Sequence, residues 1–176
     1  MRYRALVFSF FTIRFSSPML LVRDIRFEQA SQLLACYGLS LHRMDDNAEI
    51  PGTYWGAPEA GIIGPNVYVR DDTPVHSLLH EAGHLIVLSP EKREHVHTDA
   101  TDSDAEENAL LLLQVLLAER LDGATRDSAF ADMDTWGYSF RLGSARAYFE
   151  QDADDSWDWL RTRGLVDDQR RLVLPS

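Results

Sequence analysis

The sequence predicts an α+β protein in which a small, mostly antiparallel sheet packs against two helices and a helical tail follows. Two observations predict this fold. Short apolar runs separated by turn residues occupy positions 39–70, whereas apolar residues recur at helical spacing before and after them. No linker long enough to separate a second domain interrupts the 176 residues, so we expect one domain at 19–176.

The first helix is expected over residues 24–37, where apolar side chains recur at helical spacing up to the stop signal Gly38. Between 39 and 70, pairs such as Pro51-Gly52 and Gly64-Pro65 mark turns. The strands expected between such turns are Leu39–Met44, Thr53–Trp55, Gly61–Ile63 and Val67–Arg70.

Helices are expected after the sheet. Thr73-Pro74 opens the first of them, with a hydroxyl as N-cap and proline at the first helical position, and it runs to about Leu88. A second helix is expected over Asp104–Leu121, closed by Asp122-Gly123. The helical patterns of the C-terminal tail are Asp127–Asp134, Ser144–Gln151 and Asp155–Arg163.

The charge balance excludes some classes of partner. Asp and Glu number 28 against 17 Lys and Arg, which gives a formal net charge of −11. We therefore expect no nucleic-acid partner, because such proteins need a basic footprint, and no docking on an anionic membrane. Cys36 stands alone, so an intrachain disulfide is excluded and a reducing, cytoplasmic location is the simpler interpretation.

The N-terminal segment 1–18 is treated as an uncertain extension. Its basic start and the apolar run Ala5–Ile13 imitate a signal peptide, but Arg14 interrupts the run and no cleavage site precedes Pro18. The run is also shorter than the roughly 20 residues of a membrane span. A start at Met19 and a delivery segment are the alternatives.

The segment His80-Glu81-Ala82-Gly83-His84 carries the clearest chemical signal. Two histidines four residues apart lie on one face of a helix, so both imidazoles can reach one ion, and Zn²⁺ suits such ligands. Glu81 follows the first ligand, where its carboxylate can accept a proton from a water activated by the metal. We therefore expect His80 and His84 to bind zinc and Glu81 to be catalytic.

A zinc hydrolase needs a third protein ligand, and the next helix offers carboxylates. The ligand spacing of the metzincins is excluded, because Val87 and Pro90 stand at the required positions. Glu106 heads an apolar row that should face the core, where a metal would supply its counter-charge. We expect Glu106 to be the third ligand, with Glu107 and Asp104 as alternatives.

With these residues the chain resembles the gluzincin branch of the zincin metallopeptidases, and most closely the compact ImmA/IrrE-type peptidases. The resemblance covers about residues 50–121 and includes the downstream motif Glu106-Glu-Asn-Ala109. It implies a zincin-like fold, a protein or peptide substrate, and cleavage of a regulatory protein in a bacterial cytoplasm. It also implies that substrate lies along an edge strand, Val67–Arg70 or Gly61–Ile63.

One position departs from those families, which usually place Asp or Asn four residues after the ligand Glu to orient a histidine. This chain has Leu110 there. If Asp104 were the ligand, Asn108 would stand at the orienting position.

Four further residues are weaker candidates for the site. His76 lies one turn before His80, where lining the pocket is a better interpretation than binding the metal. His95 and His97 stand in a polar loop, in which solvated histidines are commoner than ligands. Tyr138 can stabilise an oxyanion, although packing of the helical tail is the default interpretation.

Two functions follow. The first is a zinc-dependent peptidase that hydrolyses a peptide bond with a metal-activated water. The alternative is a zincin-fold protein that binds zinc structurally, or binds a protein partner, without proteolysis. A fourth protein ligand such as His76, His95 or His97 would close the site to water and favour the alternative.

Overall fold

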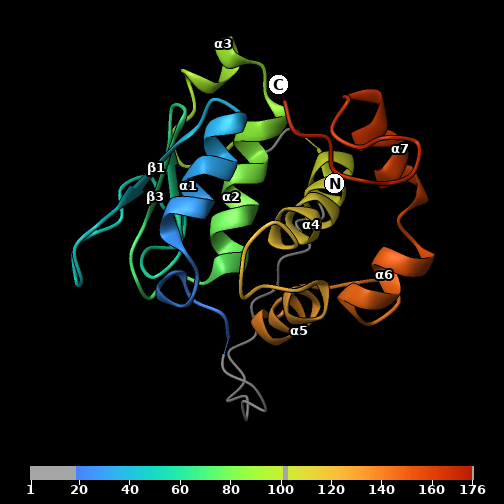
Figure 1. Cartoon of the computed structure of the whole chain (residues 1–176), viewed down its shortest axis with the longest axis horizontal. Coiled ribbons are helices and arrows are strands. Elements are labelled where there is room, and N and C mark those ends of the chain that lie inside the picture. The colour runs from blue at the N-terminus through green and yellow to red at the C-terminus, as the bar shows by residue number, and fades with distance from the viewer. Residues whose placement is uncertain (1–18, 101–102, 176) are drawn as a thin grey trace, which may run out of the picture.

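A computed structural model describes residues 19–100 and 103–175, so the expected extension 1–18 lies outside the described residues. These residues form an α+β fold with a three-stranded sheet, as the sequence predicts in outline (Figure 1). The described elements, in chain order, are η1 (Val22–Asp24), α1 (Phe27–Cys36), β1 (Ser40–Arg43), β2 (Gly61–Ile63), β3 (Asn66–Val69), α2 (Val75–Val87), α3 (Pro90–Arg93), α4 (Asp104–Ala118), α5 (Arg126–Trp136), α6 (Ala145–Gln151) and α7 (Asp154–Thr162).

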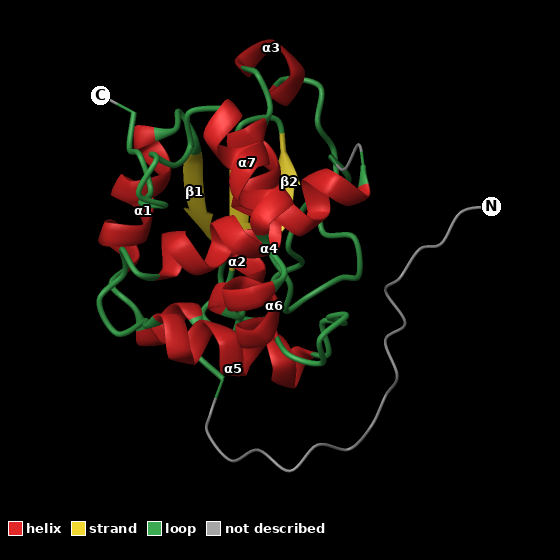
Figure 2. Ribbon diagram, turned by 90° about the vertical axis from the view of Figure 1, so that its right-hand side faces the viewer, coloured by secondary structure: helices red, strands yellow, loops and turns green. Residues whose placement is uncertain are grey.

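The elements are arranged in layers. Figure 1 shows the sheet at the left, α1 and α2 beside it, α4 next, and α6 and α7 at the right. In the view turned by 90°, the strands lie behind α2, α4 and α7 (Figure 2). Helix α2 contacts β2 and β3 on one side and α4 on the other, so α2 is the central element of the fold.

The sheet is mixed, so the expectation of a mostly antiparallel sheet was wrong. The strand order is β1-β3-β2, with β1 and β3 parallel and β2 and β3 antiparallel. The turn at 64–65 forms a hairpin of β2 and β3, as its residues predict. Segment 44–60 connects β1 to β2, which lies at the other edge of the sheet. Strand β3 then takes the position between them and runs parallel to β1.

The expected strand Thr53–Trp55 is a turn instead. Gly52 and Gly56 both have positive φ, at 73° and 93°, which extended strands do not adopt. The Thr53 hydroxyl accepts a hydrogen bond from the Gly56 N–H and closes the turn. The other three expected strands are confirmed to within one or two residues.

The close approach of α2 and α4 depends on Gly83. A Cβ atom at this position would lie 3.2 Å from the Leu110 side chain of α4, which is tighter than ordinary contact. Leu110 and Leu113 are fully buried against α2, as their place in the apolar row predicts. The expected N-cap of α2 was wrong, because Thr73 accepts a hydrogen bond from the Arg70 N–H and Pro74 holds the cap position.

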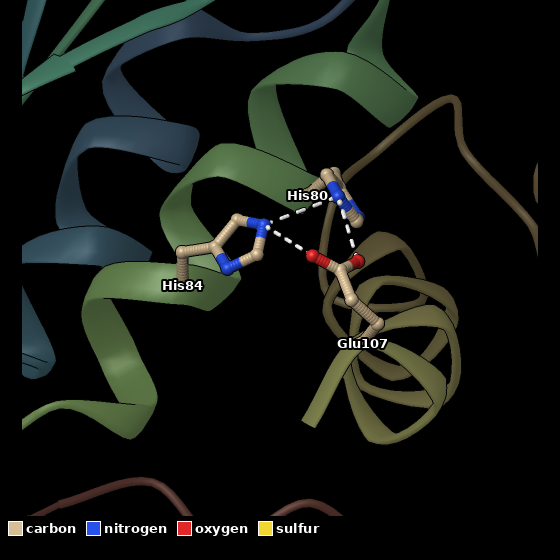
Figure 3. Close-up of side chains that lie close together, drawn as sticks. All are labelled: His80, His84 and Glu107. Atoms are coloured by element: carbon tan, nitrogen blue, oxygen red, sulfur yellow. Dashed lines mark hydrogen bonds and ion pairs between the residues drawn. The ribbon is translucent and has the colours of Figure 1, made fainter. Parts of the chain in front are cut away.

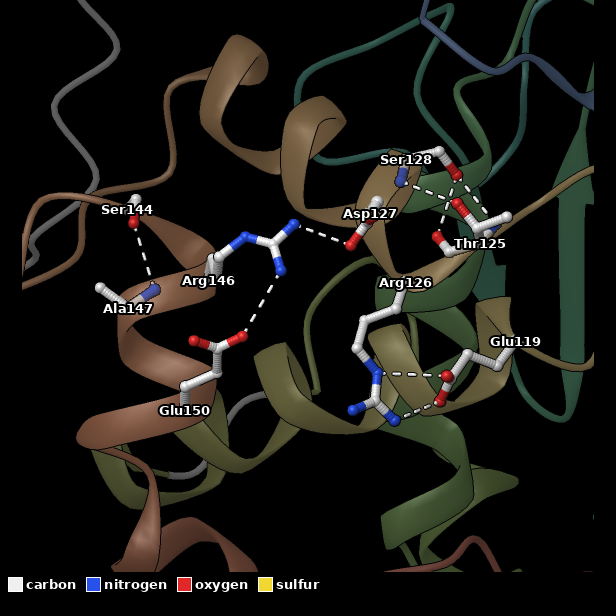
Figure 4. Close-up of polar contacts among 9 residues, drawn as sticks. All are labelled: Glu119, Thr125, Arg126, Asp127, Ser128, Ser144, Arg146, Ala147 and Glu150. Atoms are coloured by element: carbon white, nitrogen blue, oxygen red, sulfur yellow. Dashed lines mark hydrogen bonds and ion pairs between the residues drawn. The ribbon is translucent and has the colours of Figure 1, made fainter.

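The helical C-terminal tail is confirmed, and side chains fix the start of two of its helices (Figure 4). Thr125 caps α5 by accepting from the Ser128 N–H at 3.0 Å, and Ser144 caps α6 by accepting from the Ala147 N–H at 3.1 Å. Arg146 bridges Asp127 of α5 and Glu150 of α6. The ion pair of Arg146 with Asp127 thus links α6 to α5.

Within the described parts of the chain, none of the helices combines the length and the apolar character that crossing a membrane requires.

We predict that Gly61→Ala destabilises the protein by about 2 kcal/mol or more. A Cβ at Gly61 would lie 2.1 Å from the Pro51 carbonyl oxygen and 2.7 Å from the backbone of Gly52, and backbone cannot yield cheaply. Gly56→Ala is the control, because nothing lies within 4 Å of its Cβ and its cost is the positive φ alone, about 1 kcal/mol. Urea denaturation measures both, and equal losses would contradict the steric argument.

Candidate metal centre

His80 and His84 of α2 and Glu107 of α4 point toward one another (Figure 3). The two Nε2 atoms are 3.2 Å apart. One carboxylate oxygen of Glu107 lies 3.6 Å from Nε2 of His80, and the other lies 3.5 Å from Nε2 of His84. The three side chains therefore converge on one point between the two helices, and the group could hold a metal ion.

The separation of the two nitrogens fits tetrahedral coordination. Ligand atoms about 2.0–2.1 Å from an ion, the usual distance for imidazole nitrogen and carboxylate oxygen on Zn²⁺, lie about 3.4 Å from one another at tetrahedral angles. The two nitrogens are 3.2 Å apart, and each lies 3.5 or 3.6 Å from a different oxygen of the Glu107 carboxylate. One oxygen of Glu107 must therefore turn toward both nitrogens for the three residues to hold such an ion.

The other nitrogen of each ring meets a side chain of α4. Nδ1 of His80 donates to Oε1 of Gln114 at 3.0 Å, which leaves the lone pair of its Nε2 facing the site. Nδ1 of His84 lies 4.0 Å from Oε1 of Glu106, too far for a hydrogen bond, and both atoms are buried without another partner among the described residues. Gln114 thus orients the ring of His80, and Glu106 is the carboxylate that faces Nδ1 of His84.

The two neighbouring glutamates of α4 take different places. Glu106 is buried, as expected for the head of the apolar row, but it stands behind His84 instead of joining the two Nε2 atoms. Glu107, which the sequence analysis held as an alternative, is the carboxylate that the structure brings to the histidines. Asp104 is exposed at the start of α4.

The reason for this arrangement is the place of the site beside the core. The apolar row of α4 faces the centre of the interface with α2, whereas the histidines stand at its side. Glu107 and Gln114 lie on the adjacent face of α4, and this face contacts His80 and His84. In the sequence Gln114 shares a helical row with Glu107, seven residues on, but its contact with His80 was not predicted from that pattern.

The two histidines have opposite pKa shifts. Burial, together with the nearby charge of His84, lowers the pKa of His80 to about 4, so its ring is neutral at pH 7. Burial also disfavours protonation of His84, but Glu106, Glu81 and Glu107 outweigh it and raise its pKa. A metal ion at this site would therefore compete with a proton for His84.

Glu81 follows His80 on α2 and is half-buried. Burial raises its pKa to about 7, and the negative charges of Glu59, Glu107 and Asp99 add to the effect, while His84 opposes it. A carboxylate with a pKa near the working pH suits both acceptance and release of a proton. The sequence had singled out Glu81, but not Glu59.

Tyr138 and His76 form the wall next to His80. The Tyr138 ring centroid lies 5.9 Å from that of His80, and its hydroxyl lies 3.5 Å from Nδ1 of His76. Burial and the charges of Glu81 and Glu59 raise the pKa of Tyr138 far above its usual value, so the hydroxyl keeps its proton. His76 is buried against Trp136 and Tyr138 and does not join the metal-binding group.

The remaining histidines lie away from this group. His95 and His97 are exposed, and His97 contacts the Thr98 hydroxyl at 2.8 Å. His97 also pairs with Ile63 along the outer side of β2. The Val67–Arg70 segment, which the resemblance offered as an edge, contains the central strand β3.

The outer edge of β2 is already occupied. The N–H of Ile62 donates to the Gly52 carbonyl at 3.1 Å, and its carbonyl accepts from the Thr98 N–H at 3.0 Å. The outward backbone groups of this residue are therefore paired within the chain.

Comparison of the chain with models of protein families, with curated proteins and with solved structures gave no match. The resemblance to the zincins accordingly rests on the residues described above.

We predict that Glu107→Gln lowers the affinity for Zn²⁺ by at least about 100-fold, because it removes a charged ligand. Glu106→Gln should lower it by about 10–100-fold, the usual effect of losing a group that orients a ligand. Competition with a chromogenic chelator at pH 7 measures both affinities. A larger loss in Glu106→Gln would make Glu106 the ligand instead.

We predict that metal-free protein loses stability as the pH falls below 6.5, in part through His76. Burial lowers the pKa of His76 in the folded state from 6.5 to about 3. Between these two pH values the imidazole is therefore protonated in the unfolded state and neutral in the folded state. At pH 5 this difference is about 2 kcal/mol. Urea denaturation measures how much the free energy of unfolding falls between pH 7 and pH 5. This fall should be about 2 kcal/mol smaller in His76→Gln than in the wild-type chain, and equal falls would contradict the assignment.

Proposed function

We propose that this protein is a zinc-dependent peptidase that hydrolyses a peptide bond with a metal-activated water. The observation that carries the proposal is the convergence of two imidazole nitrogens and one carboxylate between α2 and α4, with a half-buried acid beside them. Three protein ligands are the number found in catalytic zinc sites, whereas structural sites usually have four.

His80, His84 and Glu107 would hold the metal, with Gln114 and Glu106 orienting the two rings. A bound zinc ion supplies a water with a pKa near 7 and an electrophile for a carbonyl oxygen. Glu81 follows His80 directly and is the base that accepts the proton of the attacking water. The same carboxyl group then donates a proton to the leaving amine, as its pKa near 7 allows.

Tyr138 completes this proposal as a hydrogen-bond donor. Its hydroxyl stays protonated at neutral pH, and its ring stands beside His80. A donor in that place suits the oxygen of a substrate carbonyl, on which negative charge grows during attack by water. The zincin resemblance further suggests a regulatory protein of a bacterial cytoplasm as the substrate.

The alternative of a structural zinc site needs a fourth ligand. Within the described residues the metal-binding group contains His80, His84 and Glu107. His76 is turned into an aromatic contact with Trp136, and His95 and His97 are exposed outside the group. These positions favour the peptidase.

We predict that Glu81→Gln retains one Zn²⁺ per chain but loses at least about 100-fold in kcat, because the amide cannot accept the proton. Elemental analysis of protein purified without a metal-affinity tag measures the zinc, and cleavage of a peptide library followed by mass spectrometry measures the activity. Tyr138→Phe should lower kcat by about 100-fold as well. Full activity in Glu81→Gln would overturn the mechanism, and absence of zinc from the wild-type chain would overturn the proposal.

A further inference from the structure

The loop that leads into β2 is anchored to α2 next to the proposed catalytic residue. The N–H of Ala60 donates to the Ser77 hydroxyl at 3.0 Å, and this contact is buried. Ser77 and Glu81 are four residues apart on α2, so they lie on the same face, one turn from each other. The hydrogen bond therefore holds Glu59, the residue before Ala60, near the face of α2 that carries Glu81, and the charge of Glu59 acts on Glu81.

The Glu59 carboxylate is half-buried without a partner of opposite charge. Among residues 19–100 and 103–175, no hydrogen bond or ion pair reaches it, and burial alone raises its pKa to about 7. The negative charge of Glu59 raises the pKa of both Glu81 and Tyr138, so it acts on the site. A carboxylate removed from water in this way gains more from a cation than one on the open surface.

The surroundings of Glu81 are acidic as well. The charges of Asp99 and Glu107 add to that of Glu59 in raising the pKa of Glu81, and His84 opposes them. The net charge of −11 extends this field to the whole chain. Such a field concentrates cationic peptides and disfavours acidic ones.

The same loop carries two aromatic side chains. Tyr54 and Trp55 are 46% and 61% exposed, and their ring centroids lie 4.8 Å apart in an edge-to-face contact. Exposed aromatic faces bind ammonium and guanidinium groups and the apolar stems that carry them. The loop thus offers a carboxylate and aromatic rings within a few residues of each other.

We propose that Glu59 is a specificity-determining residue that binds a positively charged group of a peptide, an ammonium or a guanidinium, beside Glu81. The proposal rests on the peptidase function inferred above and names the substrate class of that site. The cation comes either from a lysine or arginine side chain or from the free amino terminus of the peptide. Both sources present the same charge to the carboxylate.

Binding of three otherwise identical, fluorescently labelled peptides tests the proposal. One is N-acetylated with a central lysine, one is N-acetylated with norleucine in its place, and one has norleucine and a free amino terminus. The zinc-loaded full chain carries Glu81→Gln to prevent turnover, with and without Glu59→Gln. Glu28→Gln is the control, because Glu28 is exposed on α1, which packs on β1 at the opposite edge of the sheet from β2.

We expect at least one charged peptide to bind about 10-fold or more tightly than the neutral one. This ratio should fall to about 3-fold or less in Glu59→Gln and remain unchanged in Glu28→Gln. Preference for the lysine peptide identifies a side chain as the cation, and preference for the free amino terminus identifies the terminal amine. Equal binding of all three peptides by the chain with Glu59 intact, a ratio unaffected by Glu59→Gln, or no binding at all would each overturn the proposal.

Cleavage of the same peptides by the chain with Glu81 intact separates this proposal from the peptidase function. Cleavage without preference for charge supports the peptidase and overturns the role of Glu59. Selective binding without cleavage overturns the peptidase and leaves Glu59 as a determinant of cationic peptide binding. Equal binding of the three peptides by the chain with Glu59 intact overturns the proposal even if Glu59→Gln is unstable.

Discussion

The contact between α2 and α4 is the constraint on which the site depends. Gly83 lets the two helices approach closely, because a Cβ atom at this position would lie 3.2 Å from the Leu110 side chain. At that separation the imidazoles of His80 and His84 reach across to Glu107 without spanning a gap. The sequence between the two histidines therefore does more than separate them, because the small residue inside the motif sets the distance to Glu107.

Burial gives the site its chemical character. The same apolar surroundings keep His80 neutral, bring the pKa of Glu81 to about 7 and leave Glu106 without a partner closer than His84. Without a metal, several polar groups are buried at a cost in free energy, which a cation would offset. The metal-free fold thus stores part of the free energy that makes metal binding favourable, and binding should in turn stabilise the fold.

The sequence was sufficient to predict what local patterns determine. The helical spacing of apolar residues located α1, α2, α4 and the tail helices, and the HExxH spacing placed His80 and His84 on one face. It was not sufficient for choices that depend on how elements meet. Glu106 and Glu107 are neighbours on α4, so the orientation of this helix about its axis decides which of them faces the histidines. The direction of β3 relative to β1 depends on the path of segment 44–60. Tyr138 follows the C-terminal end of α5 and lies beside His80 through tertiary packing. No local sequence pattern predicts such a contact.

The paired outer edge of β2 has a consequence for solubility. A strand at the end of a sheet usually presents backbone donors and acceptors on which another chain can add a strand, and this is a common start of aggregation. In this protein the outward N–H and carbonyl of Ile62 are taken up by Gly52 and Thr98. The segment that closes this edge therefore protects the short β2 strand from pairing with a second molecule, and loss of that segment's contacts would expose a new surface for self-association.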